Sequence, residues 1–386
     1  MKKTILSVGY PSFPLGLAQV QRQKLLAKAI LLGGYEVTVL CRYGIHKQSD
    51  AIASKGNFEG INYIYCSGSS IRPDGYIKRN LLKIKGLFGE INYFRSFAKS
   101  KQLAGIMIST NSFHNILFYF LIGKFFGVTT TVDNVEHWTS IKGYKRLTRI
   151  EKYLYDKFYF LFTDNIICIS DFLLRKVGAF KKGKIIKIPV ITDFDKFKEY
   201  NTTKRLIDER YFLYCGSEVY FEVIEFVISS FEKARMNNMI LILVTKFSKK
   251  LEDRIRKSKI ENSIKVLSGV PYNDLVNLYI NSEALLIPMR DTDEDKARFP
   301  HKISEYCASG RPIIVNKVGE INNYFDNTNA YLCSGYDEQE FADAMQKIIS
   351  EPEQANIIAR KSYETGYVVF NYKTYSNSLI SLFIEK

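Results

Sequence analysis

The alternation of short apolar runs with helical segments constrains the fold of this chain more than any other feature. In the first half, apolar runs of strand length occur at residues 4–9, 35–41, 61–66, 104–109, 128–133, 165–169 and 185–190. Helical patterns lie between most of these runs. Strands that alternate with helices in this way predict a parallel, doubly wound α/β sheet.

A second series with the same alternation begins after residue 209. Its strand-like runs cover residues 211–215, 239–245, 264–268, 284–288, 312–315 and 330–333, and residues 337–350 have a helical pattern. A chain of 386 residues is longer than one hydrophobic core usually supports. We therefore predict two Rossmann-like, doubly wound domains that face each other across a cleft, with the active site at the carboxyl ends of their strands.

The boundaries of these domains follow from changes in the pattern. Residues 1–190 are expected to form the first domain and residues 210–370 the second. Between them, residues 191–209 lose apolar periodicity and gain charge, which is typical of a linker. Residues 371–386 contain an amphipathic stretch at 374–384 that could form a terminal helix and pack back on the first domain.

The N-terminal run and the cysteines indicate a cytoplasmic protein. The apolar run from Thr4 to Val8 follows two lysines, but it is too short for a signal peptide. The six cysteines are scattered singly, without CxxC spacing and without clustering near the four histidines, so we expect reduced core residues. We expect neither a metal site nor a disulfide.

Positive charge is concentrated in the first half. Residues 1–190 contain 29 Lys and Arg against 11 Asp and Glu, whereas the remainder has 26 against 29. The positive electrostatic potential of this half attracts an anionic partner, which could be a membrane leaflet, a lipid-linked phosphate or nucleic acid. Residues 76–102 interleave Lys and Arg with Leu, Ile, Phe and Tyr, and so predict an amphipathic helix that lies on anionic lipid. The alternative is a solvated helix with one apolar face in the core.

The strongest local signal is the segment RFPHKISEYCASGRPII, which begins at Arg298. Pro300 can begin a helix and Gly310 can end it. A helix N-terminus that carries Arg298 and Lys302 suits a diphosphate, and Glu305, one turn further along, could accept both hydroxyl protons of a ribose. The same residues would also suit a capped helix with an ion pair between Lys302 and Glu305.

This segment resembles a known donor-site motif. The run PHKISEYCASGRP is similar to the pattern P-x-K-x-x-E-Y-x-A-x-G-x-P of the retaining glycosyltransferase family 4 (group 1) enzymes, which have the GT-B fold. NIICIS with KIIKIPVITDFDKF, and VLSGVPYNDLVNLYINSEALLIP, resemble further stretches of that family. The resemblance covers most of residues 1–350 and is most specific over 264–316.

The resemblance implies a hexosyltransferase that retains anomeric configuration and takes a sugar from a nucleotide-diphosphate sugar of UDP or GDP type. In this family the first domain receives the acceptor, so the basic first half suggests a saccharide acceptor linked to polyprenyl diphosphate, in bacterial-type surface polysaccharide synthesis. The enzyme would then be cytoplasmic and peripheral on the inner leaflet of the cell membrane. Such chemistry requires no metal or other cofactor, because cations and helix dipoles stabilise the leaving diphosphate.

The resemblance also assigns individual residues. Glu305 matches the glutamate that holds the donor ribose, and Arg298 and Lys302 lie where cationic groups face the diphosphate. The backbone at Val270 matches the segment that meets the nucleobase. Gly16 matches the loop glycine that lets the backbone approach the donor phosphates and sugar.

The chain departs from the family pattern in the loop before this helix. The family has a glutamate at the position of Ala297. The preceding acidic run supplies Asp293 and Glu294, together with Asp291 and Asp295. These side chains could meet the hydroxyls of the transferred sugar, or they could form a solvated loop.

A second departure follows the first strand of the second domain. There the family offers an arginine and a lysine for the diphosphate, whereas this chain has Gly216 and Ser217 followed by glutamates. The donor diphosphate would then depend on Arg298, Lys302 and Lys246.

The segment TVDNVEHWTS follows the fifth strand of the first half, so it is expected at the active-site edge of the sheet. His137 and Glu136 are therefore candidates for contacting the transferred sugar or the acceptor hydroxyl. A lone histidine is more often structural, but the position at a strand end and the resemblance favour a role for His137.

Two other functions remain open at this point. Nucleotide-sugar epimerases share the two-domain architecture and would use the same donor. A nucleic-acid-binding protein would be attracted through the basic half, but the sequence contains no RNP-like run, zinc-finger spacing or heptad-linked basic region. We therefore expect no nucleic-acid partner.

Overall fold

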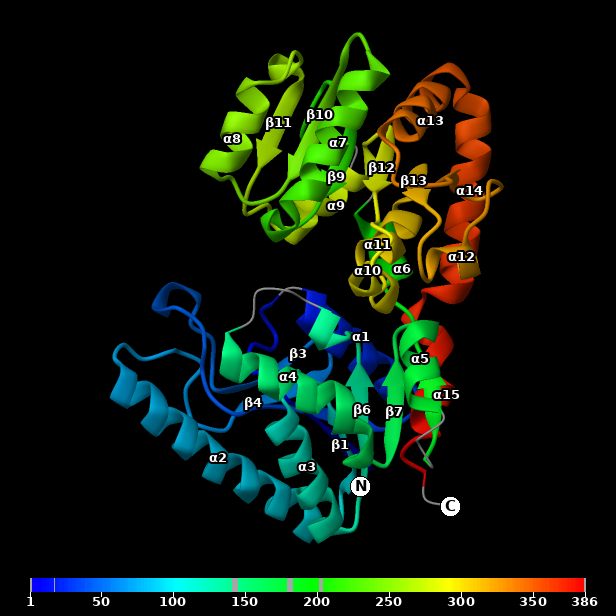
Figure 1. Cartoon of the computed structure of the whole chain (residues 1–386). Coiled ribbons are helices and arrows are strands. Elements are labelled where there is room, and N and C mark those ends of the chain that lie inside the picture. The colour runs from blue at the N-terminus through cyan, green and yellow to red at the C-terminus, as the bar shows by residue number, and fades with distance from the viewer. Residues whose placement is uncertain (1, 17, 141–144, 179–182, 201–203, 385–386) are drawn as a thin grey trace. The chain divides into compact units, whose positions relative to one another are not determined.

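The computed structural model divides the chain into two units (Figure 1). It describes residues 2–16, 18–140, 145–178, 183–200 and 204–384. Unit 1 consists of Met1–Ile191 together with Tyr372–Lys386, and unit 2 of Thr192–Asn371. The chain therefore passes from one unit to the other at two points.

Unit 1 is built on an eight-stranded sheet with the order β3-β4-β2-β1-β5-β6-β7-β8. All neighbouring strands are parallel except β3 and β4, which are antiparallel. The strands are β1 (Thr4–Val8), β2 (Glu36–Cys41), β3 (Lys55–Phe58), β4 (Ile61–Tyr65), β5 (Leu103–Ile108), β6 (Thr129–Asn134), β7 (Asn165–Cys168) and β8 (Ile185–Lys187). The helices are α1 (Ala18–Leu32), α2 (Tyr76–Lys99), α3 (Phe113–Phe126), α4 (Arg146–Phe158), α5 (Asp171–Gly178) and α15 (Ser376–Ile380), with short 3₁₀ turns at Gln48–Asp50, Trp138–Ser140, Tyr159–Leu161 and Tyr372–Tyr375.

Unit 2 contains a six-stranded parallel sheet with the order β11-β10-β9-β12-β13-β14. In order of appearance this is 3-2-1-4-5-6, the order of a Rossmann fold. The strands are β9 (Arg210–Cys215), β10 (Met239–Val244), β11 (Ile264–Leu267), β12 (Ala284–Ile287), β13 (Ile313–Asn316) and β14 (Tyr331–Cys333). The helices are α6 (Phe194–Glu199), α7 (Phe221–Ala234), α8 (Lys249–Arg256), α9 (Tyr272–Ile280), α10 (Asp293–Ala297), α11 (Lys302–Ser309), α12 (Ile321–Tyr324), α13 (Glu338–Ser350) and α14 (Pro352–Val369), with 3₁₀ turns at Glu218–Tyr220 and Glu261–Ser263.

The predicted fold class is confirmed, since each unit is a doubly wound α/β domain. Every predicted strand has a counterpart within one or two residues, apart from residues 185–190, of which only Ile185–Lys187 form β8. Strand β3 was not predicted, because its sequence KGNF contains no apolar run and its side chains are largely exposed.

The prediction of a linker at residues 191–209 is wrong in its central part. Phe194–Glu199 form helix α6, and both Phe194 and Phe197 are buried in unit 2. The ring of Phe194 packs edge-to-face on Tyr363 and Tyr367 of α14. The burial of these two rings makes the segment part of the folded unit.

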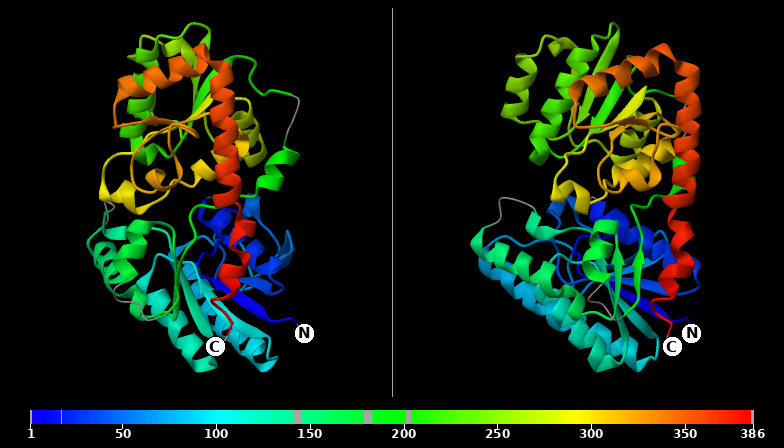
Figure 2. Two further views of the ribbon diagram at one scale, coloured as in Figure 1. Left: turned by 90° about the vertical axis from the view of Figure 1, so that its right-hand side faces the viewer. Right: turned by 45° about the vertical axis from the view of Figure 1, so that its right-hand side comes forward.

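The C-terminal segment belongs to the core of unit 1, and both chain termini lie in that unit (Figure 2). Leu379, Leu382 and Phe383 are buried in one hydrophobic cluster with residues of α1, β2 and β4. The approach is close, because a Cβ added at Gly33 would overlap the side chain of Ile380. A Cβ at Gly105 in β5 would likewise meet the Phe383 ring at 2.4 Å.

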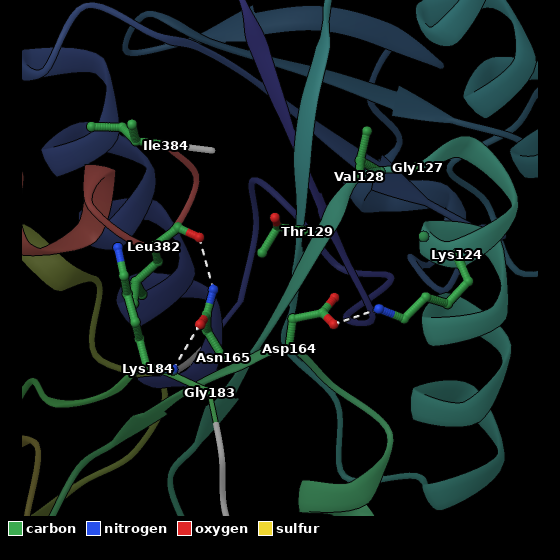
Figure 3. Close-up of a pocket in the computed structure, with 11 residues that line it drawn as sticks. Lys124, Gly127, Val128, Thr129, Asp164, Asn165, Gly183, Lys184, Leu382 and Ile384 are labelled. Atoms are coloured by element: carbon green, nitrogen blue, oxygen red, sulfur yellow. Dashed lines mark hydrogen bonds and ion pairs between the residues drawn. The ribbon is translucent and has the colours of Figure 1, made fainter. Parts of the chain in front are cut away.

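Polar contacts fix the same segment at the amino ends of β6 and β7. A hollow of about 730 Å³ lies there, and Figure 3 shows the residues that line it. The side-chain amide of Asn165 donates to the carbonyl oxygen of Leu382 at 2.8 Å and accepts from the backbone N–H of Lys184 at 3.0 Å. At the far side Lys124 pairs with Asp164 at 2.7 Å. The Asn165 amide therefore holds the end of the chain against the sheet.

A buried ion pair joins the helices and strands of unit 1. Arg22 of α1 is only 2% exposed, and its Nε lies 2.9 Å from Oδ2 of Asp133 in β6. Its Nη1 and Nη2 donate to the carbonyl oxygens of Pro189 and Ile188, at 2.7 and 3.0 Å. One guanidinium thus connects α1, the carboxyl end of β6 and the segment after β8.

We expect Asp133→Ala to destabilise unit 1 by about 3–5 kcal/mol, because it leaves the Arg22 guanidinium buried without its counter-charge. The measurement is the free energy of unfolding from denaturant titration. Lys124→Ala, which removes a partner from the solvent-exposed pair with Asp164, is the matched control and should cost about 1 kcal/mol or less. Equal losses for the two variants would contradict the role assigned to Arg22.

Candidate active site

The carboxyl edge of the unit 2 sheet is where its strand order predicts a ligand. The order in which strands are added to the sheet reverses between β9 and β12, which are parallel neighbours. At such a switch point the loops that follow the two strands diverge and leave a crevice. Gly216 and Ser217 follow β9, and Arg290 follows β12.

The loop after β9 requires glycine at its first position. A Cβ at Gly216 would lie 2.1 Å from the hydroxyl oxygen of Tyr214, so a side chain there would displace that ring. The hydroxyl of Ser217 accepts a hydrogen bond from the backbone N–H of Val219 at 3.3 Å and caps the following turn. The other two predicted loop residues lie at the same edge, because Lys246 follows β10 and Val270 follows β11 in the same parallel sheet. Lys246 is exposed and Val270 is half-buried.

The centre of this edge is a fully buried carboxylate, Asp295 of α10. Arg290 donates to it from Nε at 3.0 Å and from Nη2 at 2.9 Å. Arg298 reaches the same carboxylate with Nη2 at 2.6 Å. Two guanidinium groups are therefore fixed side by side after β12.

The surroundings of Asp295 maintain its charge. Burial alone would raise the pKa of the Asp295 carboxyl, but the hydrogen bonds from Arg290 and the charge of Arg298 lower it below the ordinary value. Two arginines therefore share this one buried carboxylate, and the Arg298 guanidinium pairs with no other acid among the described residues. Glu294 and Glu222 approach Arg290 from the more exposed side.

Tyr220 supports both arginines. The guanidinium carbon of Arg298 lies 4.3 Å from the centroid of the Tyr220 ring, and that of Arg290 lies 5.5 Å from it. The Nε of Arg298 is buried and has no hydrogen-bond partner among the described residues, so this guanidinium retains an unused donor. Sequence reasoning identified Arg298 but not Arg290 or the role of Asp295. The available signal was an arginine directly after a buried strand, followed by an acidic run.

Lys302 begins α11 and is directed toward the end of β9. Burial opposes its charge, but the Cys215 thiol and the Glu305 carboxylate outweigh that effect and raise the pKa of Lys302. The ammonium group therefore remains charged beside the loop that contains Gly216. The six cysteines are free thiols, and Cys215 is the one that is not fully buried.

Glu305 lies one turn further along α11 and is half-buried. Its Oε1 accepts a hydrogen bond from the Tyr272 hydroxyl of α9 at 3.1 Å. Burial raises the pKa of Tyr272, and the charge of Glu305 raises it further, so the phenol remains a donor. This contact holds the glutamate in a defined orientation beside the loop that contains Val270.

The two acidic candidates of α10 differ in their surroundings. Asp293 is exposed in the first turn, whereas Glu294 is half-buried and pairs with Arg290 at 3.3 Å. Asn316 of β13 fixes the strand before this loop, because its side-chain amide accepts from the backbone N–H of Met289 at 2.7 Å and donates to its carbonyl oxygen at 2.6 Å.

The remaining predicted site residues belong to unit 1. His137 follows β6, its Nε2 lies 2.7 Å from the ammonium of Lys176, and its ring packs on Phe172. The same nitrogen lies 3.6 Å from the Asp156 carboxylate, which also accepts backbone N–H groups of the following turn. Glu136 is half-buried beside His137, and Gly16 is exposed before α1.

The described residues contain no group of three or more His, Cys, Asp or Glu side chains that could hold a metal ion. They also contain no helix that is long and apolar enough to cross a membrane.

The sequence of unit 2 matches a known family. Residues 196–365 match the family model described as glycosyl transferases group 1. The matched segment includes the loops after β9 to β13 and all of the arginine cluster. No curated protein sequence matches the chain significantly.

Solved structures of low sequence identity share the fold of the whole chain. Sucrose-phosphate synthase from Thermosynechococcus elongatus has a TM-score of 0.72 at 17% identity, over 99% of this chain and 98% of that chain. A glycosyltransferase from Rickettsia africae has a TM-score of 0.68 at 14% identity, over 99% and 98% of the two chains. HepE from Anabaena, in complex with UDP-glucose, has a TM-score of 0.63 at 13% identity, over 98% of each chain.

The match of residues 196–365 favours glycosyl transfer over epimerisation, the two enzyme classes that the sequence left open. The structural neighbours share the two Rossmann-like units. Unit 2 of this chain therefore resembles the glycosyl transferases of group 1, and the chain as a whole has the GT-B fold.

Proposed function

We propose that the enzyme transfers a sugar, with retention of configuration, from a UDP- or GDP-type sugar to a lipid-linked saccharide in surface polysaccharide synthesis. The observation that carries the donor part of this proposal is the cation cluster of Arg290, Arg298 and Lys302 at the carboxyl edge of unit 2. A diphosphate leaving group gains negative charge as its bond to the sugar breaks. Cations already in position stabilise that charge without rearrangement.

Arg290 takes the place of the cations that the family offers after β9. The proposed diphosphate contacts are therefore Arg290, Arg298 and Lys302, with the backbone of Gly216 and the hydroxyl of Ser217 beside them. Lys246 is exposed after β10 and could contribute from the rim. This arrangement supplies three cations although the loop after β9 supplies none.

Glu305 is the proposed ligand of the donor ribose, and Val270 the proposed neighbour of the base. The support for Glu305 is its orientation by Tyr272, together with its position one turn from Lys302 on the same helix. The uracil-containing ligand of the Anabaena neighbour favours UDP over GDP for the donor class. Asp293, Glu294, Glu136 and His137 are the proposed contacts of the transferred sugar and the acceptor hydroxyl, and no metal takes part in the proposed reaction.

Helix α2 supports a peripheral location at the cytoplasmic leaflet. Ile77, Leu81, Ile84 and Phe88 recur at helical spacing and are exposed by 73, 60, 53 and 63%. Lysines at positions 78, 83 and 85 flank this stripe. An exposed apolar stripe with basic flanks suits the interface of an anionic membrane.

The first test is thermal-shift screening against a panel of nucleotides and nucleotide sugars. A nucleoside diphosphate should stabilise the wild-type protein by about 2.7 kcal/mol at a concentration of about 100 Kd. Glu305→Ala should abolish this shift, because the ribose loses its acceptor. Glu353→Ala, an exposed glutamate in the first turn of α14, is the control and should retain the full shift. An unchanged shift in Glu305→Ala would remove this residue from the ribose role.

The diphosphate assignment is tested by comparing UDP with uridine. Arg298→Ala should weaken UDP binding about 10- to 100-fold, the effect of losing a charge-assisted hydrogen bond, and should leave uridine binding nearly unchanged. Isothermal titration calorimetry measures both. Lys296→Ala removes an exposed cation from helix α10, two residues before Arg298, and should have little effect. Equal weakening of UDP and uridine by Arg298→Ala would indicate a structural role only.

The membrane assignment is tested by sedimentation with vesicles that contain or lack anionic lipid. The protein should sediment with the anionic vesicles, and the paired change Ile77→Glu and Phe88→Glu should reduce the bound fraction severalfold because it places charge on the apolar stripe. Ile357→Glu on α14, at a residue that is 42% exposed, is the control. The absence of lipid-dependent binding by the wild-type protein would refute the membrane assignment.

A further inference from the structure

Two adjoining hollows lie at the carboxyl edge of the unit 1 sheet. Each has a volume of about 310 Å³. The first is lined by the loop after β1 at Gly9 and Pro11, by the loop after β2, by α2 and by the start of α3. The second continues along α2, and Tyr43 and Lys83 line both hollows. Because β1 and β5 are neighbours at a switch in strand order, this edge is the expected ligand position of the unit.

Arg42 is a fixed cation in the wall of the first hollow. Its Nε donates to Glu90 at 2.7 Å, its Nη1 to Asn115 at 2.9 Å and its Nη2 to the Tyr119 hydroxyl at 3.0 Å. The Tyr119 hydroxyl in turn donates to the other oxygen of Glu90 at 2.7 Å. These bonds use three of the five guanidinium N–H groups, so the two remaining donors have a preset direction.

The charge of these hollows is positive. Glu90 is fully buried behind Arg42, and burial raises the pKa of its carboxyl while Arg42 and Tyr119 oppose that effect. No acidic side chain is found among the residues that line the two hollows. The basic lining residues are Arg42, Lys83, His114, Arg72 and Arg79.

Apolar side chains of α2 form the other wall. Ile84 and Leu87 line the first hollow, and Ile84 is also part of the exposed stripe that runs along the helix. The apolar wall is therefore continuous with the surface proposed to meet lipid. A ligand with an anionic head and an apolar chain matches this combination.

Glycines bring α2 close enough to form that wall. A Cβ at Gly86 would lie 1.9 Å from the carbonyl oxygen of Arg42, and one at Gly89 would lie 2.1 Å from that of Cys66. The helix therefore contacts the strand ends directly at these two glycines, where a larger residue would push it away from Arg42.

We propose that these hollows bind the phosphate groups of a prenyl-phosphate-linked acceptor, with Arg42 and Lys83 as the phosphate ligands and Ile84 and Leu87 in contact with the first part of the chain. This assignment rests on the proposed lipid-linked acceptor and names its site. Lys83 also lies 5.6 Å from the centroid of the Tyr43 ring, so its ammonium is held over the boundary between the two hollows.

The test is calorimetric titration of the full chain with farnesyl diphosphate, inorganic pyrophosphate and farnesol, in the presence of saturating UDP so that the donor site is occupied. Farnesyl diphosphate should bind most tightly. Lys83→Ala should weaken farnesyl diphosphate and pyrophosphate about tenfold each. Ile84→Ser should weaken farnesyl diphosphate alone. These two side chains are exposed, so the variants are expected to fold.

Lys99→Ala removes a cation from the last turn of the same helix and should leave all three titrations unchanged. Equal binding by Lys83→Ala and Lys99→Ala, or no binding of farnesyl diphosphate by the wild-type protein, would overturn the assignment. Pyrophosphate binding as tight as that of farnesyl diphosphate would identify a free-phosphate site instead and would also overturn it. The UDP-induced thermal shift reports on the donor site, and Lys83→Ala should retain it, so failure of the acceptor site is distinguishable from failure of the donor assignment.

Discussion

The buried carboxylate of Asp295 determines how the arginines are arranged at the carboxyl edge of the unit 2 sheet. Without it, Arg290 and Arg298 would repel each other and would sample many rotamers after β12. With it, both guanidinium groups lie against one carboxylate and over the ring of Tyr220. A single residue of the short helix α10 therefore positions both arginines that follow β12.

A buried carboxylate also fixes an arginine at the carboxyl edge of the unit 1 sheet. Glu90 is fully buried and holds Arg42, as Asp295 holds Arg290 and Arg298. In both units a buried acid fixes an arginine in one orientation. In unit 1 no acidic side chain lines the hollows beside that arginine, whereas in unit 2 the exposed Glu222 also pairs with Arg290.

Periodicity in the sequence was sufficient to predict the sheets, because buried parallel strands are continuous apolar runs that differ clearly from their surroundings. It was insufficient for β3, whose exposed residues carry no such run, and for α6, where only two aromatic residues indicate burial. The motif around Glu305 could be found because its residues are close in sequence. The pairing of Arg42 with Glu90 could not, since those residues are 48 positions apart and meet only after the sheet has formed. Arg290 was missed although it lies only five residues from Asp295, because nothing in the sequence distinguishes a buried aspartate from its exposed neighbours.

The burial of Leu379, Leu382 and Phe383 in unit 1 has a consequence for how the protein is made. During synthesis residues 1–191 emerge long before the segment that completes their core. Unit 1 would meanwhile expose an apolar surface on α1 and β5 where the terminal segment later packs. A chimaera that exchanges one unit between related enzymes must therefore move the two ends of the chain together.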